Sequence, residues 1–227
     1  MIPYKLITFD VYTALFDTKY SLQSQTARII SAKDTGINIK DFAEIWRSKQ
    51  LECAALVNVI QKDWLPFQEC TRRALDYTLR RFQLKISRDE QFELMKAWDQ
   101  LKPWPEADKV LADLRSRGYR LAVLSNGDEK MLRAALANIS IPFDYIFGAD
   151  LAKVYKPHPD IYFLPLNHLG LTGTDVLHVA GSARDTLGAK SAGLNCYWSN
   201  RDGDLIIDPV YFPDFEFGNL SGLLEVL

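Results

Sequence analysis

Short apolar runs recur along the chain and are typical of strands buried on both faces of a parallel sheet. They cover residues 6–9, 121–124, 145–147, 176–180 and 196–198. Apolar residues at helical spacing lie between the later runs. They predict helices around 110–114, with Gly118 as the glycine after the helix end, from about 128 to 138, from 159 to near Gly170, and before Gly193. This alternation implies right-handed crossovers and a parallel sheet.

The pattern changes between about residues 20 and 101, where strand-like runs vanish and helical spacing takes over. Two apolar stripes have this spacing. One covers residues 74–79, and the other, earlier in the chain, runs through Phe42, Ile45, Trp46, Cys53, Leu56, Val57 and Ile60. Pro103 and Pro105 follow this block. The sequence therefore predicts an α/β fold, with a doubly wound, Rossmann-like parallel sheet core (1–17 and 104–227) and an inserted α-helical cap domain (18–103).

Composition excludes several classes of protein. The 227 residues are 48% hydrophobic and 25% charged, as in globular proteins, and the net charge of −2 offers no basic field for nucleic acid. No apolar run reaches the roughly 20 residues that a membrane span needs. No export signal precedes residue 6, and Cys53, Cys70 and Cys196 lack CxxC spacing. We therefore expect a cytoplasmic protein with reduced thiols and no zinc site.

Polar residues follow three of the predicted strands. Asp10, Ser125 and Ala180 stand at strand carboxyl ends, where doubly wound sheets bind ligands, so we expect them to border one crevice. Residues 125–127 also offer a hydroxyl, an amide and free N–H groups to an anion. Each residue has an ordinary alternative. Asp10 suits a turn, Ser125 a helix N-cap, Lys156 the solvated surface, and Asp185 the first turn of a helix.

Taken together and in this order, Asp10, Ser125, Lys156 and Asp185 resemble the four motifs of the haloacid dehalogenase superfamily. Superfamily phosphatases carry a second aspartate two residues after the nucleophile, where this chain has Tyr12. Tyrosine is a poor ligand for Mg²⁺, which takes carboxylates and waters. Asp-x-Tyr is similar to the type II L-2-haloacid dehalogenases. So are residues 46–52, 121–127, 154–157 with Tyr162, and the end from 196 to 215.

The resemblance implies a metal-independent hydrolase without cofactors that acts on a small carboxylic acid. Asp10 would displace the halide at C2 of a short L-2-haloacid, and water would hydrolyse the resulting ester to a 2-hydroxy acid.

Roles for the other residues follow from the same resemblance. Arg47 would hold the halide, with Asn126 beside it. Ser125 and Lys156 would hold the substrate carboxylate, and Lys156 would keep Asp10 ionised. Asp185 would orient Lys156 or activate the water. The apolar wall of the pocket would comprise Tyr12, Leu51 and Phe67. Members of that family are commonly homodimers, so pairing of two copies is also implied.

The chain departs from the family around the expected water and leaving group. Thr13-Ala14 replaces Gly-Thr, so a hydroxyl near Asp10 is either lost or moved by one place. Ala180 and Ser182 replace serine and asparagine, and Arg184 stands where an aromatic wall of the halide pocket is expected. Ser182 and Arg184 therefore become the candidate substrate contacts there.

These departures leave other readings open. One is a related hydrolase of another 2-substituted acid, such as ring opening of azetidine-2-carboxylate. A second is a superfamily phosphatase, which Tyr12 and the lack of an acid at Ala180 or Gly181 oppose. A third is a non-catalytic binding module, because a fold does not prove activity. Retention of all four motif residues together with Arg47 opposes that third reading.

Overall fold

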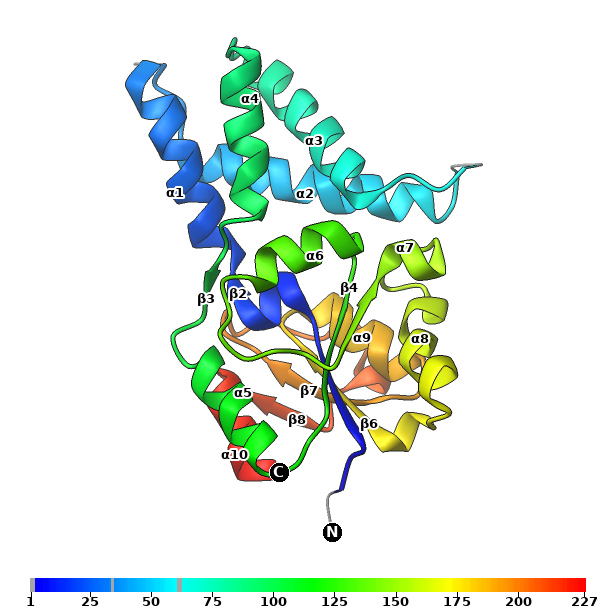
Figure 1. Cartoon of the computed structure of the whole chain (residues 1–227). Coiled ribbons are helices and arrows are strands. Elements are labelled where there is room, and N and C mark those ends of the chain that lie inside the picture. Colours follow the sequence, from blue (N-terminus) through cyan, green and yellow to red (C-terminus); the bar gives the residue numbers. More distant parts are fainter. Residues whose placement is uncertain (1–2, 34, 61–62) are drawn as a thin grey trace.

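The computed structural model describes residues 3–33, 35–60 and 63–227. Its core in this part of the chain is a six-stranded parallel sheet in the order β5-β4-β1-β6-β7-β8 (Figure 1). The strands are β1 (Leu6–Phe9), β4 (Leu121–Ser125), β5 (Tyr145–Gly148), β6 (Val176–Ala180), β7 (Asn195–Ser199) and β8 (Phe215–Phe217). Every residue of β1, β4 and β6 is buried, whereas the edge strands β5 and β8 are partly exposed. The parallel sheet and Rossmann-like fold class predicted from the sequence are confirmed.

Helices flank the sheet on both sides. The helices α5 and α10 pack together on one side, and α8 and α9 pack together on the other (Figure 1). The core helices are α5 (Ala107–Ser116), α6 (Glu129–Leu136), α7 (Ala149–Ala152), α8 (Pro159–Leu169), α9 (Ala183–Ser191) and α10 (Leu223–Val226). Gly118, just past α5, has a φ of 89°, and Gly170 ends α8 with a φ of 62°. Both glycines therefore take the left-handed conformation that terminates helices.

The helical block sits above the carboxyl ends of the strands (Figure 1). It comprises α1 (Thr18–Ile30), α2 (Ile39–Val57), α3 (Phe67–Arg81) and α4 (Arg88–Met95). A short antiparallel pair, β2 (Phe16–Asp17) with β3 (Lys102–Pro103), joins the two ends of the block. The inserted helical arrangement is thus present, while its division from the core as a domain at residues 17/18 and 103/104 stays a prediction.

The predicted apolar stripe of α2 is wrong at its end. The helix stops at Val57, and the side chains of Leu56 and Ile60 are exposed rather than buried. Ile60 follows the helix end, so helical spacing no longer places it on the face of Phe42 and Trp46, which are fully buried. Among the described residues, no helix is both long enough and apolar enough to cross a membrane.

Candidate active site

Asp10 leaves the central strand β1 directly into a π-helical turn, η1 (Val11–Leu15). Its backbone N–H donates to Val179 of β6, and one carboxylate oxygen, Oδ2, accepts from the Thr13 N–H at 2.9 Å and the Thr13 hydroxyl at 2.7 Å. The turn thus fixes the carboxylate from its own backbone. Of the two outcomes that the sequence left open, the hydroxyl near Asp10 has moved by one place and is not lost.

The second oxygen of Asp10 faces Ser125 at the end of β4 and Lys156 in the loop between α7 and α8. Its Oδ1 accepts from the Ser125 hydroxyl at 3.2 Å and lies 3.4 Å from the Lys156 ammonium. Asp10 is 7% exposed and Lys156 is 5% exposed. Because a buried carboxylate is costly without a countercharge, this ion pair offsets part of the cost of holding Asp10 away from water. Three of the four predicted motif residues therefore meet at one carboxylate.

Asp185, the fourth motif residue, lies in the first turn of α9 and holds the far side of Lys156. Its Oδ2 lies 2.9 Å from the Lys156 ammonium, and its Oδ1 accepts from the Tyr162 hydroxyl at 2.8 Å. Burial alone would raise the pKa of Asp185, but Lys156 and then His178 outweigh it and hold that pKa below its usual range. Asp185 is accordingly a firmly ionised carboxylate with its oxygens engaged.

His178 completes this cluster and was missed from the sequence. It lies within the fully buried strand β6, with Nε2 at 3.1 Å from Asp185 Oδ2 and 3.4 Å from the Lys156 ammonium. The signal was present as a single imidazole in the run Val-Leu-His-Val-Ala, which otherwise fits a core strand.

Arg47 of α2 rests on two aromatic rings, one of them in the turn that follows Asp10. Its guanidinium lies 5.4 Å from the centre of the Tyr12 ring and 5.3 Å from that of Trp98, and it donates to the side chain of Gln50. Desolvation lowers the pKa of Arg47 to about 10, although the charge of Asp10 opposes this shift. Among the residues that the structure describes, no carboxylate forms an ion pair with Arg47.

Two more polar groups in this aromatic cluster lack partners. The Tyr12 hydroxyl and the Trp98 indole nitrogen are buried, and no described residue forms a hydrogen bond with either. Phe67 lies against Tyr12 with 5.7 Å between ring centres, while the role of Tyr12, Leu51 and Phe67 as a pocket wall stays a prediction. A half-buried cation beside two unpaired hydrogen-bond donors is an environment that suits an anion or a partly negative leaving group.

Asn126 and Asp128, which follow β4, form hydrogen bonds to the loop of Lys156 and to the start of α3. The Asn126 side-chain oxygen accepts from the backbone N–H of Lys156 at 2.7 Å, and its role beside the halide stays a prediction. The Asp128 carboxylate accepts from the backbone N–H groups of Phe67 and Gln68, both at 3.0 Å. Asp128 therefore caps α3 from the core and anchors the helical block over the site. The sequence did not indicate this contact across 60 residues.

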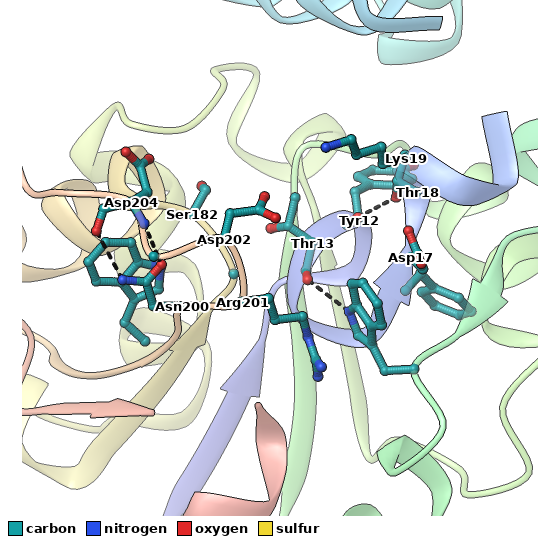
Figure 2. Close-up of a pocket in the computed structure, with 15 residues that line it drawn as sticks. Tyr12, Thr13, Asp17, Thr18, Lys19, Ser182, Asn200, Arg201, Asp202 and Asp204 are labelled. Atoms are coloured by element: carbon teal, nitrogen blue, oxygen red, sulfur yellow. Dashed lines mark hydrogen bonds between the residues drawn. The ribbon is translucent and has the colours of Figure 1, made fainter. Parts of the chain in front are cut away.

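Two cavities flank the nucleophile turn, and Thr13, Thr18 and Lys19 border both. One, of about 390 Å³, is lined by Arg47 and Leu51 from α2. The other, of about 460 Å³, lies between the turn carrying Tyr12 and Thr13 and the loops carrying Ser182 and Asp202 (Figure 2). Both volumes suit small ligands.

The remaining predicted contacts lie at the periphery. Ser182 borders the larger cavity, but its hydroxyl accepts from the Asp185 N–H at 3.3 Å and so caps α9. Arg184 is exposed in the first turn of α9, and its charge helps to lower the pKa of Arg47. Neither forms a hydrogen bond with Asp10, Ser125 or Lys156. Their roles as substrate contacts stay predictions.

Gly181 allows the two catalytic loops to touch. A Cβ at this position would lie 2.3 Å from the Thr13 carbonyl carbon and 2.5 Å from the Ala14 nitrogen, both backbone atoms. We expect Gly181→Ala to push the Asp10 turn away from α9, lowering the free energy of unfolding by about 1–3 kcal/mol and slowing turnover. Urea denaturation and initial rates measure both effects. Gly218→Ala is the control, since its Cβ meets nothing within 4 Å, and equal losses in the two variants would contradict the expectation.

Comparison with known proteins agrees with this geometry. A family model described as haloacid dehalogenase-like hydrolase matches residues 4–193, which is most of the chain. The chain belongs to the haloacid dehalogenase-like hydrolases. This dehalogenase-like hydrolase is 31% identical over 223 residues to haloacetate dehalogenase H-2 of Moraxella sp. (strain B), covering 97% of this chain and 96% of that protein.

Two further comparisons concern the same group of enzymes. The hydrolase is 36% identical over 195 residues to an (S)-2-haloacid dehalogenase of Xanthobacter autotrophicus, covering 84% of this chain and 73% of that protein. A solved structure of L-2-haloacid dehalogenase from Xanthobacter autotrophicus, with chloropropionic acid covalently bound, superimposes with a TM-score of 0.83 at 29% identity. That match covers 98% of each chain. The resemblance that the sequence motifs indicated is thereby confirmed.

Proposed function

We propose that this hydrolase converts short L-2-haloacids to 2-hydroxy acids through an ester on Asp10, without a metal ion. One observation carries the proposal. A buried carboxylate, fixed by Thr13 and paired with Lys156, lies near enough to Arg47 for its charge to oppose the lowering of the Arg47 pKa, and Arg47 pairs with none of the described carboxylates. The first group suits a nucleophile, and the second suits a halide that leaves with negative charge. The names of the relatives support the same reaction.

The reaction proceeds in two displacements. A carboxylate oxygen of Asp10 attacks C2 of the substrate from the side opposite the halogen, and the carbon–halogen electron pair departs with the halide toward Arg47 and Asn126. The Ser125 hydroxyl and the Lys156 ammonium hold the substrate carboxylate. Water then adds to the carbonyl carbon of the Asp10 ester, the 2-hydroxy acid leaves, and one proton passes to solvent. The configuration at C2 is inverted once.

The contacts of Asp185 distinguish between its two expected roles. Its oxygens accept from Lys156, Tyr162 and His178, and its pKa is held low. A general base should have a pKa near the working pH and a free lone pair toward the water. These observations favour Asp185 as the group that orients Lys156. Homodimer formation and a cytoplasmic location belong to the same proposal and rest on the sequence alone.

The proposal is tested by chloride release from L- and D-2-chloropropionate in EDTA. We expect release from the L isomer alone, with D-lactate as product, because a single in-line displacement inverts C2. No release from either isomer would reject the haloacid assignment. The same enzyme would then be offered azetidine-2-carboxylate, and p-nitrophenyl phosphate with Mg²⁺, which separate the two alternative reactions. Binding of lactate without turnover of any substrate would indicate a non-catalytic module.

Arg47→Met is expected to lower kcat/KM by about 10²–10³-fold without destabilising the protein. A lowered pKa means that folding disfavours the charged form of Arg47, so at neutral pH this cation costs stability rather than supplying it. Initial rates and thermal unfolding measure the two effects. Lys40→Met removes a charge from the exposed face of the same helix and should change neither. A large loss of stability in Arg47→Met would contradict a role in leaving-group binding.

A further inference from the structure

A row of polar side chains crosses the centre of the sheet beneath the site. Thr8 of β1 lies in register with His178 of β6, which lies in register with Cys196 of β7. All three are fully buried. Central strands of a parallel sheet are normally apolar throughout. A buried imidazole at this position is costly unless its ring nitrogens have hydrogen-bond partners.

Both ring nitrogens of His178 have partners. Nδ1 lies 2.9 Å from the Thr8 hydroxyl, and Nε2 lies 3.1 Å from Asp185 Oδ2 and 3.4 Å from the Lys156 ammonium. The edge of the ring also meets Tyr162, with 5.7 Å between ring centres. The imidazole thus bridges a core hydroxyl and the ion pair that faces Asp10.

These partners determine the protonation state of His178. Ionised Asp185 can only accept, so Nε2 carries the hydrogen and Nδ1 accepts from the Thr8 hydroxyl. Burial lowers the pKa of His178, and the Lys156 charge adds to this, against the pull of Asp185 and Asp10. Its other titratable neighbours, Tyr162 and the Cys196 thiol, have raised pKa values and are neutral. The ring is therefore a neutral donor over the physiological range.

We propose that His178, held by Thr8, is a positioning residue that fixes the Asp185 carboxylate and, through it, the Lys156 ammonium against Asp10. A second donor on Asp185 Oδ2 prevents that carboxylate from rotating and from drawing Lys156 away from the nucleophile. None of the assigned catalytic roles includes His178 or Thr8. The effect on rate rests on the proposed function, whereas the effect on Lys156 does not.

The first test replaces the imidazole in two ways. His178→Leu removes the donor, and His178→Gln places an amide nitrogen near the position of Nε2. We expect His178→Leu to lower kcat by roughly ten- to a hundredfold, with KM changed less than about threefold, because small displacements of catalytic groups cost this much. His178→Gln should recover most of the rate. Equal losses in both variants, or a loss confined to KM, would overturn the proposal.

The second test concerns Thr8 and uses a matched pair. Thr8→Val keeps the shape and the β-branch but removes the hydroxyl, whereas Thr8→Ser keeps the hydroxyl. Thr8→Val should lower kcat severalfold and Thr8→Ser should retain most of it. The ¹⁵N shifts of the His178 ring should show hydrogen on Nε2 alone at neutral pH. The chain has three histidines, so His178→Leu assigns the signals. Hydrogen on Nδ1, or on both nitrogens, would overturn the proposal.

A third readout separates this proposal from the proposed reaction. Crystal structures of the variants report the distance between the Lys156 ammonium and Asp10 Oδ1, which should lengthen in His178→Leu and stay close to 3.4 Å in His178→Gln. The longer distance is expected because the Asp185 carboxylate, once it loses a donor, can rotate and draw the ammonium away from Asp10. An unchanged distance in both variants would refute the positioning role even if chloride release is normal. A longer distance in His178→Leu of a protein that releases no chloride would leave the positioning role standing and reject the haloacid reaction.

Discussion

Asp10→Asn is expected to release no measurable chloride from L-2-chloropropionate, a loss of about 10⁴-fold or more in kcat. The amide oxygen of asparagine is a poor nucleophile, and no other carboxylate of the cluster can replace Asp10, because the oxygens of Asp185 are engaged by Lys156, Tyr162 and His178. Asparagine has nearly the same shape, and its oxygen can still accept from Thr13. Thermal unfolding should therefore show a folded variant, which separates lost chemistry from lost structure.

Isotope labelling in the wild-type protein tests the same step without a mutation. In a single turnover in H₂¹⁸O, with enzyme in excess, the label should enter the Asp10 carboxylate, and the product should carry an unlabelled hydroxyl oxygen. This follows because the oxygen joined to C2 comes from Asp10, while water attacks the carbonyl carbon of the ester. Mass spectrometry of the peptide holding Asp10 reports the label. Label in the first product molecule would mean direct attack by water and would exclude the ester.

The architecture of the core was predictable because its signals are local. The runs at 6–9, 121–124 and 176–180 became the three fully buried central strands. Their carboxyl ends bring Asp10 and Ser125 within 3.2 Å of each other, as strand topology requires. Elements without a local signal were not predicted. The pair β2 and β3 is two residues long, and β8 forms at a partly exposed edge, so neither leaves an apolar run.

The missing parts of the site are contacts across long stretches of chain. Trp98 lies against Arg47 although 50 intervening residues separate them, and helical spacing alone marks Trp98 as ordinary core. His178 is recognisable only when its register with Thr8 and its distance to Asp185 are known. The position of the Thr13 hydroxyl depends on the π-helical turn, whose conformation a list of residues does not specify. The sequence motifs thus located the nucleophile, whereas the contacts of Trp98, His178 and the Thr13 hydroxyl became visible only in the structure.

Lys156→Met is expected to lower the free energy of unfolding by about 3–5 kcal/mol at neutral pH and to remove turnover. Methionine keeps the length of the side chain but leaves Asp10 and Asp185 as two buried carboxylates without their shared cation. Urea denaturation measures the change. Lys5→Met, which breaks an ion pair on a largely exposed lysine, is the control and should cost about 1 kcal/mol or less.

The pH dependence of that loss identifies its cause. In the wild type the pKa of Asp185 is depressed, so its contribution to stability is present above the ordinary carboxyl pKa of about 4 and is lost only as pH falls toward the depressed value. Without Lys156, burial is less opposed and the pKa of Asp185 rises, so protonation of that carboxylate relieves the penalty as pH falls. The deficit of Lys156→Met should therefore be largest near neutrality and shrink towards about pH 4. A deficit that does not vary with pH would attribute the loss to packing, and the ion pair would then not be what holds these carboxylates in the core.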